Sequence, residues 1–421
     1  MTLARPEAPE EFPDRPLLVS EKDIEAGILT GEIFGIVKCG LRVPPEKVSY
    51  FSAFPPIFKN TKIDLENIGP HMQAYAKSIG RTKGVERSLI SSMFGDELII
   101  LTTLFKRYIQ MGLVCTGMEW VLEYNPQPAF KWFVDKVSDD RRRADLDPDM
   151  AIIGETSKTS GNASYGYCCI DKSRHNCVKF CEQKDLDKHI RDPFFKNVEE
   201  LGGGLFEVVK GKRRVVQDTP IQVAIAVYSM AKLCLLEFWL FLKDHLDEAL
   251  YCEIETDTDS LYIAIARETL DECVKPEKLQ HWFRKKYDYF ASDSEELVSF
   301  DSREITAKQY GKRTPGLFKL EFSGDGIVAL NSKVFHIWGT DKRGESVFKT
   351  SSKGMQTRNN LIREDFLDVL QNKSEHTVQN AGFIDEGVRK GTYIQTKKGL
   401  NYFYCKRIVL EDGVSTTHLE I

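Results

Sequence analysis

The sequence predicts an α+β fold in which a long core helix backs an antiparallel sheet. Apolar residues recur at helical intervals from Ile221 to Leu242, directly after Thr219, which suits a capping hydroxyl, and Pro220, which suits a first helical turn. The segments that follow, 251–266 and "GLFKLEFSGDGIVALNSKVFHIWG", alternate apolar and polar residues between glycines, as strands do. We therefore expect the sheet to lie against the helix.

Segments earlier in the chain also show either helical spacing or strand-like alternation of apolar residues. The stretch "GEIFGIVKCGLRVPP" alternates well enough for a strand. Residues 86–112 carry apolar side chains at helical spacing, so we expect a helix there. The stretch "SDDRRRADLDPDMAIIGETSKTSGNASYG" predicts two helical segments that are separated at Pro148.

Length and charge limit the functional classes. A chain of 421 residues accommodates roughly two to four structural units. The formal net charge of -5 does not indicate a generally basic nucleic-acid binder, so any polyanion would have to bind local basic patches. Two patches are candidates: "KGKRR" (210–214), and residues 388–407, where basic and aromatic residues interleave.

Cysteine usage and hydropathy predict an intracellular protein that is not secreted and has no membrane partner. Ten cysteines lie among mostly apolar neighbours, and the N-terminal residues do not resemble a signal peptide. The long apolar stretch is interrupted by Gln222, Lys232 and Glu237, which a bilayer would penalise. One cluster leaves open a zinc-dependent interaction module, although its spacing is poor for zinc: Cys168, Cys169, His175, Cys177 and Cys181.

The stretch "EIETDTDSLYIAIA" (253–266) is the first candidate site. Alternate residues of a strand share a face, so Asp257 and Asp259 would repel each other unless a cation or a basic partner lay between them. Oxygen ligands favour Mg²⁺, with Mn²⁺ as the alternative. An Asp-Thr-Asp triplet is also typical of a turn with solvated carboxylates, and this alternative stays open.

A second candidate is a polar stripe on the predicted helix before residue 168. Lys158, Asn162 and Tyr165 are spaced to lie on one helical face, which could hold a triphosphate and contact a sugar or base. Arg142 and its two arginine neighbours upstream could add guanidinium contacts to the same phosphates. A partly exposed helix with incidental polarity would have the same pattern.

Taken together, these stretches resemble a known family. "KTSGNASYG" resembles the KxxxNSxYG motif of family B DNA polymerases, "DTDS" resembles their YxDTDS motif, and "SKVF" resembles the KxY motif, in the same order along the chain. The resemblance is to the protein-primed branch of Polinton or Maverick elements and related viruses. It extends from about residue 31 to the C-terminus.

The resemblance implies a right-hand polymerase fold with an incomplete palm, helical fingers and a small thumb, acting as a DNA-directed DNA polymerase. In the family, Asp259 would bind catalytic Mg²⁺ with Asp257 beside it, and the helical stripe with Arg142 would hold the deoxynucleotide. Lys333, Phe335 and Gly166 would contact DNA. The implied segments are a palm remnant with an insertion (1–125), fingers (126–175), a second insertion (176–218), palm (219–345) and thumb (346–421).

The implied partners are a DNA template-primer, deoxynucleoside triphosphates and a terminal priming protein, in the nucleus or at a viral replication site. The chain departs from the family pattern at several positions. The upstream DxxSLYP motif, which supplies another metal-binding aspartate, is missing, so the sequence looks truncated at or before it. Ala163, Glu255 and Phe335 replace a serine and two tyrosines of the motifs. Two hypotheses follow: an active polymerase portion, or a catalytically dead remnant that binds DNA or nucleotide.

Overall fold

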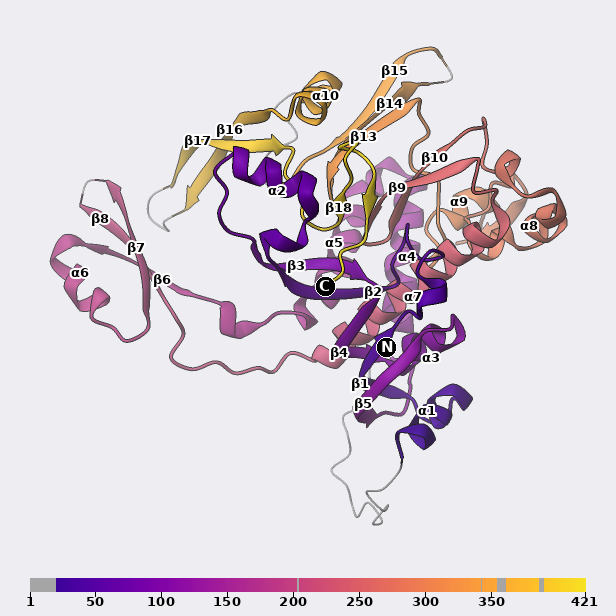
Figure 1. The fold of residues 1–421 in the computed structure, drawn as a ribbon, viewed down its shortest axis with the longest axis horizontal. Helices are drawn as coiled ribbons and strands as arrows, with labels where there is room; N and C mark the ends of the chain where they lie inside the picture. The colour runs from indigo at the N-terminus through magenta and orange to yellow at the C-terminus, as the bar shows by residue number, and fades with distance from the viewer. Residues whose placement is uncertain (1–19, 203, 342, 354–360, 386–389) are drawn as a thin grey trace.

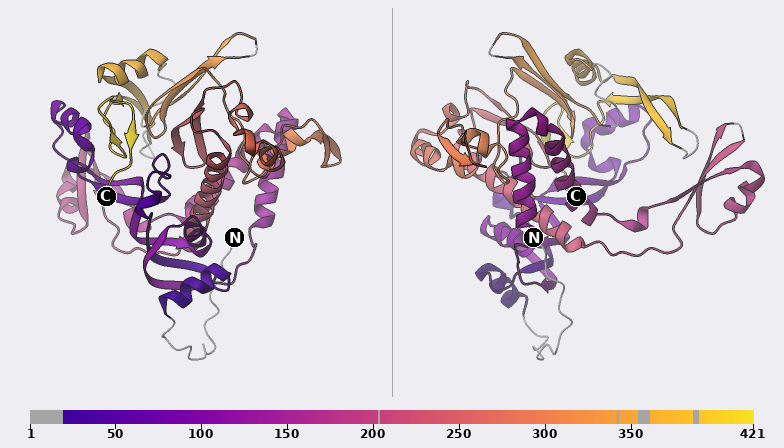
Figure 2. Two further views of the ribbon diagram at one scale, coloured as in Figure 1. Left: turned by 45° about the vertical axis from the view of Figure 1, so that its right-hand side comes forward. Right: turned by 180° about the vertical axis from the view of Figure 1, so that it is seen from behind.

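The computed structural model describes residues 20–202, 204–341, 343–353, 361–385 and 390–421. The described chain forms an α+β fold of helices and small antiparallel sheets, which confirms the predicted class. The long helix α7 (Ile221–His245) lies near the centre of the molecule (Figures 1 and 2). The other elements are arranged around it.

The N-terminal part forms a three-stranded antiparallel sheet with β1 in the centre. Val37 and Leu41 of β1 lie in the largest hydrophobic core, whereas Ile36 packs in a separate cluster with Ala226 of α7. The strand is therefore covered on both faces, and the strand predicted here is confirmed. The elements of this part are α1 (Glu21–Thr30), β1 (Gly35–Arg42), β4 (Phe94–Leu101), α3 (Thr102–Gln110) and β5 (Val114–Glu123).

The helix predicted over 86–112 is wrong in its first half. There β3 (Val85–Ser92) pairs with β2 (Ile57–Ile63), β4 pairs with β1, and only α3 is helical. Exposure alternates over the middle of β4, from Glu97 to Ile100, where Ile99 is 47% exposed and Ile100 only 7%. A short run of apolar residues fits both the helical period and the strand period. Pairing with β1 and β2, which lie earlier in the chain, decided in favour of strands.

A second core joins distant parts of the chain. Met72 and Tyr75 of α2 share one hydrophobic cluster with Phe366 of α10 and Leu400 of β17. Residues near position 70 and residues beyond 360 therefore fold as one body, as Figure 1 shows. The further elements here are η1 (Pro45–Lys47), η2 (Leu65–Asn67), α2 (Gly69–Ser78), β13 (Gly326–Asn331), β14 (Val334–Thr340), β15 (Ser346–Ser351), α10 (Arg363–Asn372), β16 (Glu375–Asp385), β17 (Lys390–Asn401), β18 (Ile408–Val409) and β19 (Thr416–Thr417).

Two helices follow the N-terminal sheet, as the sequence predicts. α4 (Lys131–Leu146) and α5 (Ala151–Cys168) are separated by a 3-10 turn at Pro148–Met150 and pack against each other, and α5 also contacts α7. A Cβ at Gly154 of α5 would lie 2.5 Å from the Cβ of Ala144 in α4. The glycine therefore permits the close approach of the two helices.

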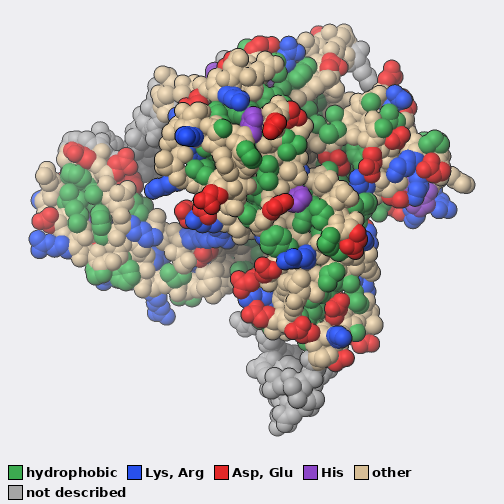
Figure 3. All heavy atoms as spheres, in the orientation of Figure 1, with side chains coloured by type: hydrophobic (Ala, Val, Ile, Leu, Met, Phe, Trp, Pro, Cys, Tyr) green, Lys and Arg blue, Asp and Glu red, His purple; other side chains and the backbone are tan. Residues whose placement is uncertain are grey.

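A small lobe projects from the body after α5 (Figure 1). It is a three-stranded antiparallel sheet in the order β6-β8-β7, with α6 beside it. Val178 and Phe180 of β6 are 44% and 42% exposed, and Figure 3 shows apolar side chains gathered on this lobe. Its elements are η4 (Lys172–Arg174), β6 (Cys177–Glu182), α6 (Gln183–Ile190), β7 (Phe195–Gly202) and β8 (Leu205–Lys210).

Helix α7 begins at Ile221, which confirms the predicted helix but corrects its cap. Pro220 occupies the N-cap position and no side chain caps the helix. The Thr219 hydroxyl instead accepts a hydrogen bond from the side chain of Gln217 and lies 3.5 Å from the carbonyl oxygen of Ile170. Thr219 thus fixes the entry of the chain into α7 through tertiary contacts.

By length and composition, α7 is the one helix of the described residues that could cross a membrane. In this fold its apolar side chains supply several cores at once. Leu236 and Trp239 lie in the largest core, and Phe241 and Leu242 lie in a third core with Trp282. The apolar side chains of α7 that contribute to these cores account for much of its apolar composition.

The third core lies beneath the hairpin that carries the Asp-Thr-Asp triplet. Phe238 of α7 stacks on Phe318 with ring centroids 3.9 Å apart, and Phe241 stacks on Trp282 at 5.0 Å. Tyr251, Leu261 and Ile265 pack on this core, so α7 backs the hairpin that segment 251–266 forms. The elements here are β9 (Tyr251–Asp257), β10 (Ser260–Ile265), η5 (Asp271–Cys273), η6 (Pro276–Lys278), α8 (Leu279–Lys285), η7 (Lys286–Asp288), β11 (Leu297–Phe300), β12 (Arg303–Thr306) and α9 (Ala307–Gly311).

Candidate active site

The Asp-Thr-Asp triplet forms the tip of the β9–β10 hairpin. Asp257 pairs with Ser260, so Thr258 and Asp259 make the turn. The backbone N–H of Asp259 donates to the carbonyl oxygen of Asp257 at 2.6 Å, and Thr258 has a φ of 58°. This is the geometry of a γ-turn, which is rare and strained for a β-branched residue. Backbone strain of this kind is concentrated at functional sites.

This turn corrects the expected geometry of the aspartates. They do not lie on one face of a continuous strand, because the chain reverses between them. Asp257 ends β9 with a side chain that is 18% exposed, whereas Asp259 is exposed at the tip. The alternative interpretation of the triplet, a turn with solvated carboxylates, is therefore correct for the backbone. It is wrong for Asp257, because that carboxylate is mostly shielded from solvent.

A second hairpin turn meets the first. Lys333 lies between β13 and β14 with a φ of 64°, and its Nζ lies 3.0 Å from Oδ1 of Asp257. Phe335 packs against Tyr262 of β10 with ring centroids 4.8 Å apart. The structure thus brings together Asp257, Lys333 and Phe335, three of the residues that the sequence assigned to one site.

Glu255 provides a further contact between the two hairpins. Its Oε1 accepts a hydrogen bond of 2.8 Å from the backbone N–H of Lys333. Its Oε2 is buried without a hydrogen-bond partner among the described residues. Burial first, and then the negative charge of Asp257, raise the pKa of Glu255 to about 7.

A second lysine lies within electrostatic range of this carboxylate pair. Lys406, between β17 and β18, is partly buried; burial first, then the charge of Lys353, lower its pKa, whereas Asp257 and Glu255 oppose that shift. The carboxylates of Asp257 and Glu255 therefore lie near two lysines from distant segments, Lys333 and Lys406. Such an arrangement can bind phosphates next to a cation site.

The carboxylates of this site can be compared with the ligands that usually bind Mg²⁺ in proteins. Among the described residues no three His, Cys, Asp or Glu side chains converge on a common metal position. Glu255 is directed to the Lys333 backbone, so Asp257 and Asp259 are the carboxylates that this turn carries. Mg²⁺ is commonly held by one or two carboxylates together with substrate phosphates and water. The two aspartates fit that role, and Lys333 Nζ is the cation beside Asp257 in this structure.

The predicted nucleotide stripe lies on α5, away from these contacts. Lys158 and Asn162 are exposed, and the Lys158 ammonium lies 3.8 Å from the carboxylate of Glu155. Tyr165 contacts Tyr228 of α7 edge-on at 6.2 Å, and a Cβ at Gly166 would meet no atom within 4 Å. Within the described residues, no hydrogen bond or ion pair joins the stripe to the aspartates.

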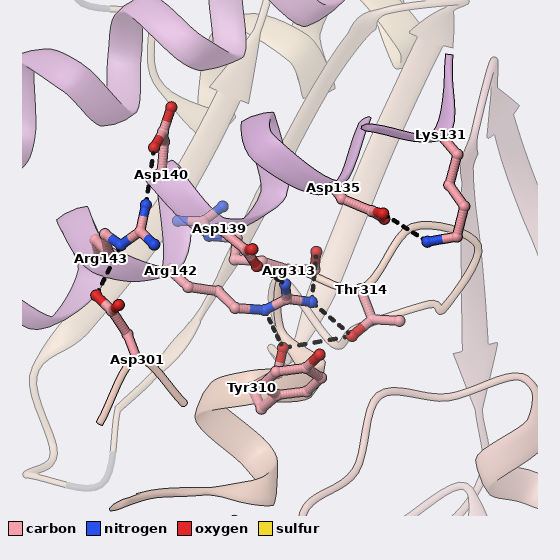
Figure 4. Close-up of polar contacts among 10 residues, drawn as sticks. All are labelled: Lys131, Asp135, Asp139, Asp140, Arg142, Arg143, Asp301, Tyr310, Arg313 and Thr314. Carbon is pink, nitrogen blue, oxygen red and sulfur yellow. Dashed lines mark hydrogen bonds and ion pairs between the residues drawn. The ribbon is translucent and has the colours of Figure 1, made fainter. Parts of the chain in front are cut away.

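Arg142 differs from its expected role. Its side chain is 6% exposed, and its guanidinium donates to the carbonyl oxygens of Tyr310 and Arg313, to Thr314 Oγ1 and to Asp139 (Figure 4). These partners take four of the five N–H donors of the guanidinium, so in this structure Arg142 fastens α4 to α9 and to the residues that follow it. The sequence could not distinguish this use from phosphate binding, since both need a planar donor fork.

The other predicted groups are dispersed. Cys168 and Cys169 bond to carbonyls of α5, and Cys177 and Cys181 lie in β6 of the lobe. In the basic patch 210–214, Lys210 and Arg213 both pair with Asp192. Of the patch 388–407, residues 388 and 389 lie outside the described residues.

Sequence reasoning missed the contact of Glu255 with the Lys333 turn and the approach of Lys406. Lys406 was part of the basic and aromatic C-terminal patch, which is the signal that could have singled it out. Glu255 stood out in the sequence as a departure from the motif, but its partner did not, because that partner is a backbone group more than seventy positions away.

Comparisons of this chain with protein-family models, with curated proteins and with solved structures find no match.

Proposed function

We propose that this chain is the polymerase portion of a family B DNA polymerase of the protein-primed type, which transfers a nucleotide from a deoxynucleoside triphosphate to a primer hydroxyl. The observation that carries the proposal is the ion pair between Asp257 and Lys333. The resemblance assigns these residues to one catalytic centre, and two separate hairpins bring them into contact.

In this proposal each residue has a role set by its place. Asp257 and Asp259 would hold Mg²⁺, or Mn²⁺ in its place, and this ion would supply charge neutralisation at the triphosphate and a more acidic primer hydroxyl. Lys333, supported by Phe335, would steady the primer strand with its ammonium group. Because Lys333 is 53% exposed, it can exchange Asp257 for a phosphate without unfolding the turn.

The incoming nucleotide would meet α5. Lys158 and Asn162 are exposed, and the ring of Tyr165 is braced by Tyr228, so the stripe is accessible for a triphosphate and a base. Gly166 leaves open space beside it for DNA. The proposed segments are those of a right hand: a palm around the aspartates, fingers formed by α4 and α5, a lobe as the second insertion, and a thumb formed by the residues after β14.

A second candidate function is a remnant that binds DNA or nucleotide without catalysis. One observation favours it: within the described residues only two carboxylates are available to a metal, and one of them is paired with a lysine. The lysines around the site would retain affinity for a polyanion in that case.

Primer extension with Mg²⁺ and deoxynucleotides separates the two functions. Asp259→Asn removes a charge from an exposed turn position and leaves the fold intact, so any loss of synthesis reports on chemistry. Asp187→Asn, at an exposed carboxylate of α6, is the matched control. Synthesis that falls at least about a hundredfold in Asp259→Asn alone supports the polymerase. Equal background from all three proteins, with retained primer-template binding, supports the remnant.

A further inference from the structure

The backbone of Lys333 is held in a conformation that its side chain disfavours. A φ of 64° is left-handed, and residues with a Cβ seldom adopt it. Its N–H donates to Glu255 Oε1 at 2.8 Å, and its carbonyl oxygen accepts from Ser351 Oγ at 2.9 Å. Both peptide groups of the turn residue are thus bound by side chains from other strands.

We propose that Glu255 is a positioning residue, which holds the Lys333 turn so that its ammonium group reaches Asp257. The primer-binding role of Lys333 rests on the proposed function, whereas the contact between Glu255 and the turn does not. Glu255 touches neither the substrate nor the metal in this proposal. It acts through the backbone of Lys333.

The geometry around Glu255 supports this role over that of a third metal ligand. Oε1 is directed to the Lys333 N–H, and Oε2 is enclosed by protein atoms, so neither oxygen is presented at the exposed tip with Asp259. Glu255 is also paired in register with Tyr262, whose ring packs on Phe335. The two hairpins are therefore attached at two neighbouring points, one polar and one aromatic.

Removal of the Glu255 carboxylate would affect the Lys333 turn before it affects the aspartates. Without the acceptor, the left-handed turn loses one of its two side-chain anchors, and the ammonium of Lys333 samples more positions. Binding of the primer strand would then weaken more than the chemical step, because the aspartates keep their own turn. A glutamine at this position retains an oxygen that can accept the same hydrogen bond.

Hydrogen–deuterium exchange at the Lys333 amide tests the contact without any need for activity. Overlapping peptides across 331–334 would compare the wild-type chain with Glu255→Ala, Glu255→Gln and the control Glu268→Ala, at an exposed carboxylate beyond β10. We expect exchange about tenfold faster in Glu255→Ala and near wild-type rates in the other two. If alanine abolishes the thermal unfolding transition, Glu255→Met repeats the test with the side-chain volume retained.

Unchanged exchange in Glu255→Ala, or equal acceleration in Glu255→Gln, would overturn the assignment of Glu255. Primer extension adds the functional arm: in Glu255→Ala the KM for primer-template should rise several-fold more than kcat falls, with recovery in Glu255→Gln. A wild-type chain that extends no primer would refute the proposed function, whereas the exchange rates would still decide whether Glu255 positions the turn.

Discussion

Trp239 Nε1 donates a hydrogen bond of 3.0 Å to Glu253 Oε1, which ties the core helix α7 to the base of the β9–β10 hairpin. The indole is 1% exposed and stacks on Phe51 and Phe54. Aromatic packing on one side and a polar bond on the other thus set the position of the hairpin on the helix. The orientation of the Asp-Thr-Asp turn at the other end of this hairpin depends on the attachment.

Trp239→Phe should destabilise the chain by about 2–4 kcal/mol, because it leaves a cavity and removes the partner of Glu253. Urea unfolding measures the change. Trp132→Phe, at a side chain that is 68% exposed, should change the unfolding free energy by less than about 0.5 kcal/mol. Similar values for the two variants would contradict the proposed importance of the attachment.

Arg142→Lys should destabilise the chain by about 2–3 kcal/mol, although it keeps the charge. A lysine ammonium cannot reach the carbonyl oxygens of Tyr310 and Arg313 and the Asp139 carboxylate in one planar geometry. Chemical denaturation provides the value. Arg191→Lys, whose side chain is 83% exposed, should have little effect. If Arg142 bound the nucleotide, Arg142→Lys would instead lower the affinity for the nucleotide and leave the free energy of unfolding unchanged.

Lys232→Met should stabilise the chain below pH 8 by about 1–2 kcal/mol. Burial in α7 lowers the pKa of Lys232 to about 8, so the folded state binds the proton less well than the unfolded state. The side chain keeps some exposure, and water therefore screens part of the full penalty.

The pH dependence follows from the same shift. With a folded pKa below the unfolded one, the cost of the buried charge is complete below pH 8 and disappears as pH rises toward 10.5, so wild-type stability should gain on the variant over that range. Unfolding curves at pH 7 and pH 10 measure this difference. A constant gap between wild type and Lys232→Met would refute the burial of the charge; Lys22→Met at an exposed position serves as control.

Lys333→Met should weaken primer-template binding by about threefold to tenfold and lower the salt slope of log K by about one, if its ammonium contacts one phosphate. Fluorescence anisotropy over a range of salt concentrations gives both quantities. Lys22→Met, on the exposed face of α1, should change neither. A weaker affinity with an unchanged slope would point to a structural role of the side chain through Asp257.

Several elements were predictable because local chemistry dictates them. The interruption at Pro148 separates α4 from α5, and the periodic apolar residues after Pro220 define α7. The segment 86–101 was not predictable in the same way, since its short apolar run suits helix and strand, and pairing with β1 and β2 decided it.

The candidate site likewise has features that were predictable from the sequence and features that were not. Charge and motif could be read from the residues alone, and they marked Asp257, Asp259, Lys158 and Lys333 as candidates. The partners of these residues depended on packing, which places Lys333 on Asp257, Glu255 beside the backbone of Lys333 and Arg142 in an internal network. Periodicity and turn chemistry act over a few residues, whereas an ion pair or a backbone hydrogen bond between hairpins depends on how distant segments pack around one core.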